Sequence, residues 1–142
     1  MEELTLAIVK PDSVAARNSG KILAHLEQAG FQIRALRMCK LTAETAAEFY
    51  AEHQGKEFFE PLIRFMSSGP IIVAAVAREN AVAELRRIIG ATDPAEAEPG
   101  TVRALYAENK TRNAIHASDS RRSAQRELNF FFSRWELITN GL

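Results

Sequence analysis

The chain has 142 residues, enough for one compact domain, and its 18 Lys and Arg residues balance 18 Asp and Glu residues. A net charge of zero provides no global basic field for nucleic acid, so nucleic acid is not expected as the main partner and any anion site must be a local cluster. With one cysteine, an acidic start and no apolar run long enough to cross a bilayer, we expect a cytoplasmic single domain over residues 1–142 with no membrane association.

Four strands are predicted in chain order, over residues 6–10, 31–41, 70–78 and 114–118. The first ends at Lys10, because Pro11 removes a backbone donor and turns the chain. The second alternates in a partly broken pattern, which indicates a half-exposed strand. The third is continuously apolar, as expected for a strand covered on both faces.

Helices are predicted over residues 21–30, 43–54, 57–70, 79–90 and 120–132, with a short one starting near Thr101. Thr42 can cap the second of these, and Gly30 and Gly90 end the first and the fourth. Two strands follow one another with only helical material between them. This order favours an antiparallel α+β sandwich over a doubly wound parallel sheet.

Common nucleotide and metal motifs are absent from the sequence. It contains no Gly-x-Gly, no complete phosphate-binding loop, no His-Glu-x-x-His and no pair of cysteines. A zinc site held by the protein is therefore not expected. Phosphate binding, if present, requires another arrangement of residues.

His116 is the residue that invites a chemical interpretation. It lies between a short apolar pair and the cluster Ser118-Asp119-Ser120, and Glu127 falls at the edge of the apolar stripe of the last predicted helix. A carboxylate there could fix the tautomer of an imidazole and leave its other nitrogen as a nucleophile. The residues alone leave open a nucleophile, a metal ligand and an ordinary polar residue at the end of a strand.

Two arginines have a similarly open status. Arg86 borders the apolar stripe of its helix, and Arg103 falls in the first turn of a helix, where the helix dipole disfavours a cation. An anionic ligand would explain the position of Arg103. An ion pair or a solvated side chain is the alternative for each arginine. The two remaining histidines, His25 and His53, are expected at the surface.

The segment Asn113-Ala-Ile-His-Ala-Ser-Asp-Ser closely resembles the signature Asn-x-x-His-Gly-Ser-Asp of nucleoside diphosphate kinases. The resemblance covers essentially the whole chain, because Lys-Pro-Asp near the start, EFYAEH, KEFF, MSSGP, a TDP loop and PGTVR follow in family order and spacing. It implies a ferredoxin-like α+β sandwich with a four-stranded antiparallel sheet, assembled as homotetramers or homohexamers. By family analogy, subunit contacts are expected in the loop of residues 92–99 and in residues 133–142.

The resemblance also implies an activity. In a ping-pong reaction with Mg²⁺, a nucleoside triphosphate would phosphorylate the histidine, and a nucleoside diphosphate, ribo or deoxyribo, would collect the phosphoryl group. No protein ligands for the metal are implied, since the nucleotide phosphates would hold it. Phosphoryl transfer depends mainly on positioning and charge neutralisation, which suits this set of residues.

The resemblance assigns roles to individual residues. His116 would be the nucleophile, Glu127 would hold its other ring nitrogen, and Ser118 would support Glu127. The nucleotide contacts it implies are Lys10 and Asn113 on the sugar 3′-hydroxyl, Arg86, Thr92 and Arg103 on the phosphates, Tyr50 on the transferring group and Phe58 on the base. Stacking on one phenylalanine grips any base, so broad base tolerance is expected.

The sequence departs from the family pattern in a few places. Ala117 replaces the usual glycine after the histidine, which would cost about 1 kcal/mol if that position needed a positive φ. Lys110 stands near where the family often has an apolar residue against the base. KEFF lacks a common proline, and VAARNSG differs from the usual Arg-Gly turn. None of these changes removes a group that phosphoryl transfer needs.

Three rival interpretations remain. A non-catalytic relative would usually have lost the histidine or an arginine, and this chain keeps both. A nucleic-acid-binding domain would be retained on DNA in a salt-dependent manner without phosphoryl transfer. A purely structural protein would leave the combination of Arg86, Arg103 and His116 unexplained.

Overall fold

The computed structural model describes residues 2–139. An antiparallel sheet of four strands forms its centre, in the order β2-β3-β1-β4. The strands are β1 (Glu2–Val9), β2 (Gln32–Cys39), β3 (Ile71–Glu79) and β4 (Ile115–Ala117). This arrangement confirms the ferredoxin-like α+β sandwich. Residues 140–142, the end of the stretch expected to contact other subunits, lie outside the described residues.

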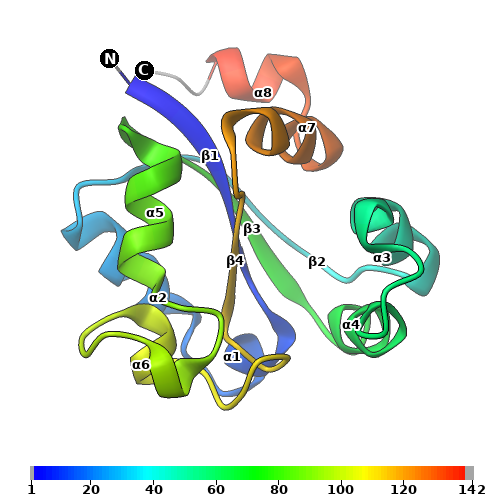
Figure 1. The fold of residues 1–142 in the computed structure, drawn as a ribbon. Coiled ribbons are helices and arrows are strands. Elements are labelled where there is room, and N and C mark those ends of the chain that lie inside the picture. The colour runs from blue at the N-terminus through cyan, green and yellow to red at the C-terminus, as the bar shows by residue number, and fades with distance from the viewer. Residues whose placement is uncertain (1, 140–142) are drawn as a thin grey trace.

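Helices cover both faces of the sheet (Figure 1): α2, α5 and α6 lie on one side, and α3, α4, α7 and α8 lie on the other. The α-helices are α1 (Pro11–Ala15), α2 (Ser19–Gln28), α3 (Ala43–Phe49), α4 (Phe59–Met66), α5 (Ala81–Ile89), α6 (Val102–Tyr106), α7 (Arg121–Phe131) and α8 (Arg134–Thr139). Two short 3₁₀-helices are η1 (Ala51–His53) and η2 (Pro94–Glu96). None of the helices within residues 2–139 has the length and apolar character that crossing a bilayer requires.

The alternation of side chains along β1 supplies a core to each face. Leu6 and Ile8 pack with α3, α4 and α7, whereas Ala7 and Val9 pack with α2 and α5. These four side chains are at most 1% exposed. The continuous apolar run in β3 follows from the same position, because β3 is an interior strand covered on both faces.

Several elements differ from the expected ones, among them the helix predicted over residues 43–54, which is divided into α3 and η1. Pro11 does not only end the first strand, because it is the first residue of α1, where a proline needs no backbone donor. The helix over residues 120–132 is not the last one, since α8 follows it after a short break. The broken alternation of residues 31–41 has a physical cause, a register shift between Ile33 and Ala35 in the pairing of β2 with β3.

The pairing of β4 with β1 positions the candidate chemistry. Ile8 lies opposite His116, and the backbone N–H of Lys10 donates to the carbonyl of Ala114 at 2.9 Å. The segment around His116 is therefore fixed to an interior strand of the sheet. Ser120 caps the N-terminus of α7 by accepting the N–H of Ser123, which brings this helix back over the end of β4.

Candidate active site

A cavity of about 500 Å³ lies beside β4, between α5, η1, α4 and α7. Side chains from segments far apart in the sequence line it. The predicted site residues that do so are Lys10, Tyr50, Phe58, Arg86, Thr92, Arg103, Asn113, His116 and Glu127. Ser118 is fully buried behind the cavity and contacts Glu127. The structure thus brings all the predicted site residues together.

His116, Glu127 and Ser118 form a connected group. The Nε2 atom of His116 donates to Oε1 of Glu127 at 2.6 Å, and the Ser118 hydroxyl donates to the same oxygen at 2.8 Å. Glu127 is only 3% exposed although it belongs to a mostly polar helix. This arrangement sets the ring tautomer, because Nε2 carries the proton and Nδ1 is left unprotonated, with its lone pair available.

Burial lowers the pKa of His116, an effect that outweighs the opposing influence of Glu127. The neutral ring therefore persists to lower pH than that of a free histidine. Phe49 and Tyr50 pack their rings edge-on against the imidazole, with centroids 5.5 Å and 5.9 Å away. The ring is thus held by packing as well as by its hydrogen bond, and a neutral imidazole with a free Nδ1 is a competent nucleophile.

Lys10 and Asn113 form a second pair at the cavity. Lys10 Nζ donates to Asn113 Oδ1 at 2.8 Å, and both residues are buried. Burial, together with the nearby charge of Arg103, lowers the pKa of Lys10 to about 7. The opposing charge of Asp12 is the smallest of these influences, so a bound anion would raise the pKa of Lys10 again.

Arg103 makes contacts that the sequence could not indicate. Its Nε, Nη1 and Nη2 atoms donate to the backbone carbonyls of Asn113, Gly90 and Ile115, at 3.3, 3.1 and 2.7 Å. These three carbonyls explain why a cation can lie in the first turn of α6, and no anionic ligand is needed for that explanation. They occupy three of the five N–H donors of the guanidinium group. Two donors remain for an anion in the cavity that Arg103 lines.

Arg86 approaches the same strand from α5, and its Nη1 lies 3.4 Å from the carbonyl of Ala117. Arg103 and Arg86 thus follow the outer side of β4, while His116 pairs with β1 on the inner side. Their proximity lowers the pKa of Arg103 to about 10, second to the effect of burial. Two adjacent guanidinium groups make a local anion site.

Tyr50 contributes a buried hydroxyl to the cavity lining. Within residues 2–139 this hydroxyl has no hydrogen-bond partner. Burial raises the pKa of Tyr50 well above its usual value, so the phenol stays protonated and can donate. An unpaired buried hydroxyl is costly, and a ligand oxygen in the cavity would satisfy it.

The mouth of the cavity is aromatic and basic. Phe58 is 50% exposed there, whereas its neighbour Phe59 is buried in the core. Lys56 lies over the Phe58 ring at 5.6 Å from its centroid, and Lys110 also lines the cavity. An exposed flat ring with cations in the same cavity suits the face of a nucleobase attached to phosphates.

His53 lines the cavity, although the sequence predicts it as an ordinary surface residue. The ring of His53 stacks against Tyr50 with centroids 6.2 Å apart, and it packs against Phe58 at 5.3 Å. Glu52, Leu62, Thr111 and Asp119 are further lining residues that were not expected. For His53, the spacing of three residues after Tyr50 was the available signal, because the helical turn of η1 brings these rings together.

The glycine-to-alanine departure at position 117 has little backbone consequence. Ala117 lies in β4 and is not among the residues with a positive φ, so no left-handed penalty applies. The positive φ in this segment belongs instead to Ala114, at 74°. The added methyl group of Ala117 is 5% exposed and lines the cavity.

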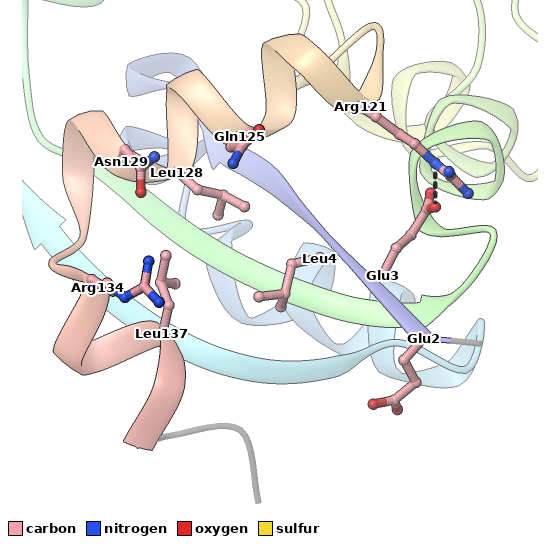
Figure 2. A pocket seen from close by; sticks show the side chains of 9 residues that line it. All are labelled: Glu2, Glu3, Leu4, Arg121, Gln125, Leu128, Asn129, Arg134 and Leu137. Atoms are coloured by element: carbon pink, nitrogen blue, oxygen red, sulfur yellow. Dashed lines mark hydrogen bonds and ion pairs between the residues drawn. The ribbon is translucent and has the colours of Figure 1, made fainter.

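A larger cavity, about 680 Å³, lies elsewhere in the molecule (Figure 2). It opens between the first residues of β1 and helices α7 and α8, and we call it the α7–α8 groove. Its lining residues are Glu2, Glu3, Leu4, Arg121, Gln125, Leu128, Asn129, Arg134 and Leu137. The three leucines come from three different elements, and the dashed line in Figure 2 marks the ion pair of Arg121 with Glu3.

Comparisons with known proteins agree with this geometry. A family model described as nucleoside diphosphate kinase matches residues 3–137. A nucleoside diphosphate kinase from Actinobacillus pleuropneumoniae serotype 5b (strain L20) is 49% identical over 138 residues, covering 97% of this chain and all of the relative. One from Methanocaldococcus jannaschii is 50% identical over 138 residues, covering 97% of this chain and 99% of that protein.

Solved structures give the same result. A crystal form of the Aquifex aeolicus nucleoside diphosphate kinase superposes with a TM-score of 0.94 at 48% identity, covering 96% of this chain and 99% of that one. A halophilic nucleoside diphosphate kinase from Halobacterium salinarum in complex with CDP superposes with a TM-score of 0.92 at 36% identity, covering 96% and 91%. With this agreement in sequence, fold and cavity, the chain belongs to the nucleoside diphosphate kinase family.

Proposed function

We propose that this chain transfers the terminal phosphoryl group of a nucleoside triphosphate to a nucleoside diphosphate through a phosphohistidine at His116. The observation that carries the proposal is the bond of His116 Nε2 to Glu127, which leaves Nδ1 with its lone pair facing a cavity lined by cations. Family membership supports the same reaction. It would serve both ribo- and deoxyribonucleotide pools.

In the first half-reaction, Nδ1 of His116 attacks the γ-phosphorus, the bond to the bridging oxygen breaks, and the nucleoside diphosphate leaves with that electron pair. Glu127 stabilises the positive charge that develops on the ring. Arg86, Arg103 and the hydroxyl of Tyr50 neutralise charge on the transferring group. In the second half-reaction, a β-phosphate oxygen of another nucleoside diphosphate attacks the phosphorus and the N–P bond breaks.

The remaining residues position the nucleotide. Phe58 stacks on the base, Lys10 and Asn113 bind the sugar 3′-hydroxyl, and Thr92 supports the phosphates. The Halobacterium salinarum relative was solved with CDP, a nucleoside diphosphate, which supports this class of substrate. The 3′-hydroxyl contacts would accept ribose and deoxyribose alike.

We propose Mg²⁺ as the cofactor, carried in by the nucleotide phosphates. No group of three or more His, Cys, Asp or Glu side chains that could hold a metal ion occurs within residues 2–139. The available residues fit a metal held mainly by phosphate oxygens and water, since Mg²⁺ usually takes only one or two carboxylates from a protein. Asp119 is a carboxylate in the cavity lining and can bind water of the metal's shell. The ion would supply charge neutralisation on the phosphates.

We also propose that residues 1–142 form one kinase domain that assembles into homotetramers or homohexamers in the cytoplasm. The family match over residues 3–137 supports the single domain. Exposed apolar side chains support assembly, since Leu36 and Met38 on the edge strand β2 are 51% and 59% exposed and Trp135 on α8 is 74% exposed. The unpaired Cys39 fits a reducing compartment.

Incubation with γ-labelled ATP and Mg²⁺, followed by a chase with GDP, tests the proposed reaction. The wild type should acquire an acid-labile label that moves to GTP, and His116→Ala should acquire none. A label that forms but cannot be chased would indicate a phosphohistidine carrier instead. Absence of label in folded wild-type protein would overturn the proposal.

A further inference from the structure

The segment that joins Asn113 to His116 contains a strained turn. Ala114 has a φ of 74° and is fully buried, and the N–H of Ile115 donates to the carbonyl of Asn113 at 2.9 Å. A hydrogen bond across one residue with a positive φ defines a γ-turn, which is rare and strained. An L-residue in the left-handed region costs about 1–2 kcal/mol, so the surroundings must hold the turn in place.

The polar groups of this turn bond to three residues from two other segments. The carbonyl of Ala114 accepts the N–H of Lys10 at 2.9 Å, and the carbonyl of Asn113 accepts Nε of Arg103 at 3.3 Å. The N–H of Ala114 donates to Oδ2 of Asp12 at 3.0 Å. Of these partners, Asp12 is the one whose side chain does not line the 500 Å³ cavity of His116, which we call the nucleotide cavity after the proposed function.

Asp12 is an unusual residue to find in this position. It is 6% exposed, and burial raises the pKa of its carboxyl group. Its Oδ1 atom has no hydrogen-bond partner within residues 2–139. An ionised carboxylate is costly to bury, so a buried one with only part of its bonding capacity used does not serve stability alone. A hydrophobic side chain would avoid the cost of burying a charge but would leave the buried N–H of Ala114 without an acceptor, so the carboxylate is specifically tied to this turn.

The location of Asp12 indicates how it would act. It lies in α1, two residues after Lys10, and lines a separate cavity of about 430 Å³ with Arg112, Gly69 and Pro70. It therefore reaches the active site from behind, through the backbone of Ala114. One end of the turn carries Asn113, the partner of Lys10, and the other end leads to His116.

We propose that Asp12 is a positioning residue for phosphoryl transfer: its carboxylate holds the N–H of Ala114, and so fixes the strained turn that aligns Asn113 and His116 with Lys10. This inference rests on the proposed function. Asp12 itself touches neither nucleotide nor phosphoryl group. Its effect belongs to the alignment of the reacting groups, where a misplacement of about 1 Å can cost about 100-fold in rate.

The first test compares Asp12→Ala with Asp12→Asn by steady-state kinetics at a temperature where circular dichroism shows both to be folded. Asp12→Ala should lower kcat about 10- to 100-fold with a smaller change in KM, because alignment is lost more than nucleotide affinity. Asp12→Asn keeps an oxygen that can accept the Ala114 N–H, so it should restore most of kcat. If Asp12→Ala does not fold, Asp12→Ser, whose shorter side chain cannot span the same distance, replaces it.

Glu3→Ala is the matched control. Glu3 lies in β1 and also accepts a backbone N–H through its carboxylate, that of Val82 in α5 at 2.9 Å, but it lines the α7–α8 groove and not the cavity of His116. It should lower the melting temperature and leave kcat unchanged. Unchanged kcat per folded Asp12→Ala molecule would make Asp12 merely structural and overturn the proposal. A kcat for Asp12→Asn as low as that of Asp12→Ala would overturn the role of the accepted hydrogen bond.

A double-mutant cycle with Ala114→Gly tests the role of strain. Glycine adopts a positive φ without penalty, so the turn should need Asp12 less. The loss of kcat caused by Asp12→Ala should therefore be several-fold smaller in the Ala114→Gly background. Equal losses in the two backgrounds would contradict the proposal. Failure of the wild type to form phosphohistidine would instead count against the proposed function, since the Asp12 results compare rates among enzymes that form it.

Discussion

Helix α7 borders two cavities that differ in what they can do. On one side, Glu127 faces the 500 Å³ nucleotide cavity and holds His116. On another, Gln125 and Leu128 line the larger α7–α8 groove of Figure 2. By volume alone, the α7–α8 groove would be the better candidate for a binding site. Its ion pair, however, involves an Arg121 side chain that is 83% exposed and therefore already solvated. Buried polar groups with unsatisfied bonding capacity, not volume, distinguish the nucleotide cavity.

The largest expected effect is at Arg103 of the nucleotide cavity, and the contrast is with Arg121 of the α7–α8 groove. Arg103→Ala would leave three backbone carbonyls without the guanidinium group, so the free energy of unfolding should fall by about 3 kcal/mol. Activity should fall as well, because the turn at Ala114 loses support. Urea unfolding and kinetics check this. Unchanged stability would mean that water replaces all three contacts.

Phe58→Ala tests the aromatic mouth of the nucleotide cavity. Base stacking on an aromatic ring contributes about 1–3 kcal/mol, so KM for nucleotides should rise between about 5- and 150-fold. The rise should be similar for purines and pyrimidines, since a ring face does not distinguish base edges. Leu137→Ala, in the α7–α8 groove, is the control and should leave KM unchanged. A loss restricted to one base would show that the mouth reads base edges.

Glu127→Gln tests the carboxylate that faces the nucleotide cavity. The amide oxygen can still accept from His116 and Ser118, but it cannot stabilise the charge that develops on the ring. We expect kcat to fall about 10-fold, a loss of about 1.4 kcal/mol in transition-state stabilisation. Gln125→Ala on the groove side of the same helix should leave kcat unchanged. Equal effects of the two substitutions would mean that α7 acts only as a scaffold.

Lys10 provides a prediction about protons. With a pKa of about 7, it is only partly charged in the free protein at pH 7–8, and a bound anionic nucleotide should raise that pKa. Binding of ADP at pH 8 should therefore take up a fraction of a proton, and uptake should vanish below about pH 5.5, where Lys10 is already charged. Calorimetry in buffers of different ionisation enthalpy measures this. Lys10→Met should abolish the uptake.

The smallest effect is expected at the groove. Arg121→Ala removes an exposed ion pair, and its partner Glu3 keeps the N–H of Val82. The free energy of unfolding should change by less than about 0.5 kcal/mol, and kcat should not change. Urea unfolding measures the change in free energy, and steady-state kinetics measures kcat. A change in kcat would show that the α7–α8 groove is coupled to the nucleotide cavity.

The sequence predicted the sheet, most helices and the residues that gather around His116 for identifiable reasons. The apolar run of β3 and the stripes of α5 and α7 follow from local periodicity, and the family resemblance assigned the site residues. The contact of Asp12 with Ala114 could not be predicted, because it joins residues 102 positions apart and depends on a positive φ. Helix α1 was missed because Pro11 ends a strand and begins a helix equally well.

The two guanidinium groups along β4 also determine how the sheet can grow. Arg103 and Arg86 lie against the outward carbonyls of Ile115 and Ala117, where a fifth strand would otherwise bond. They therefore block strand addition at that edge, whereas the opposite edge, β2, stays open. Of these two edges, β2 is the one at which another copy could extend the sheet without meeting these arginines. Variants that remove both arginines would free the backbone carbonyls of a second sheet edge for pairing with other chains, which favours aggregation.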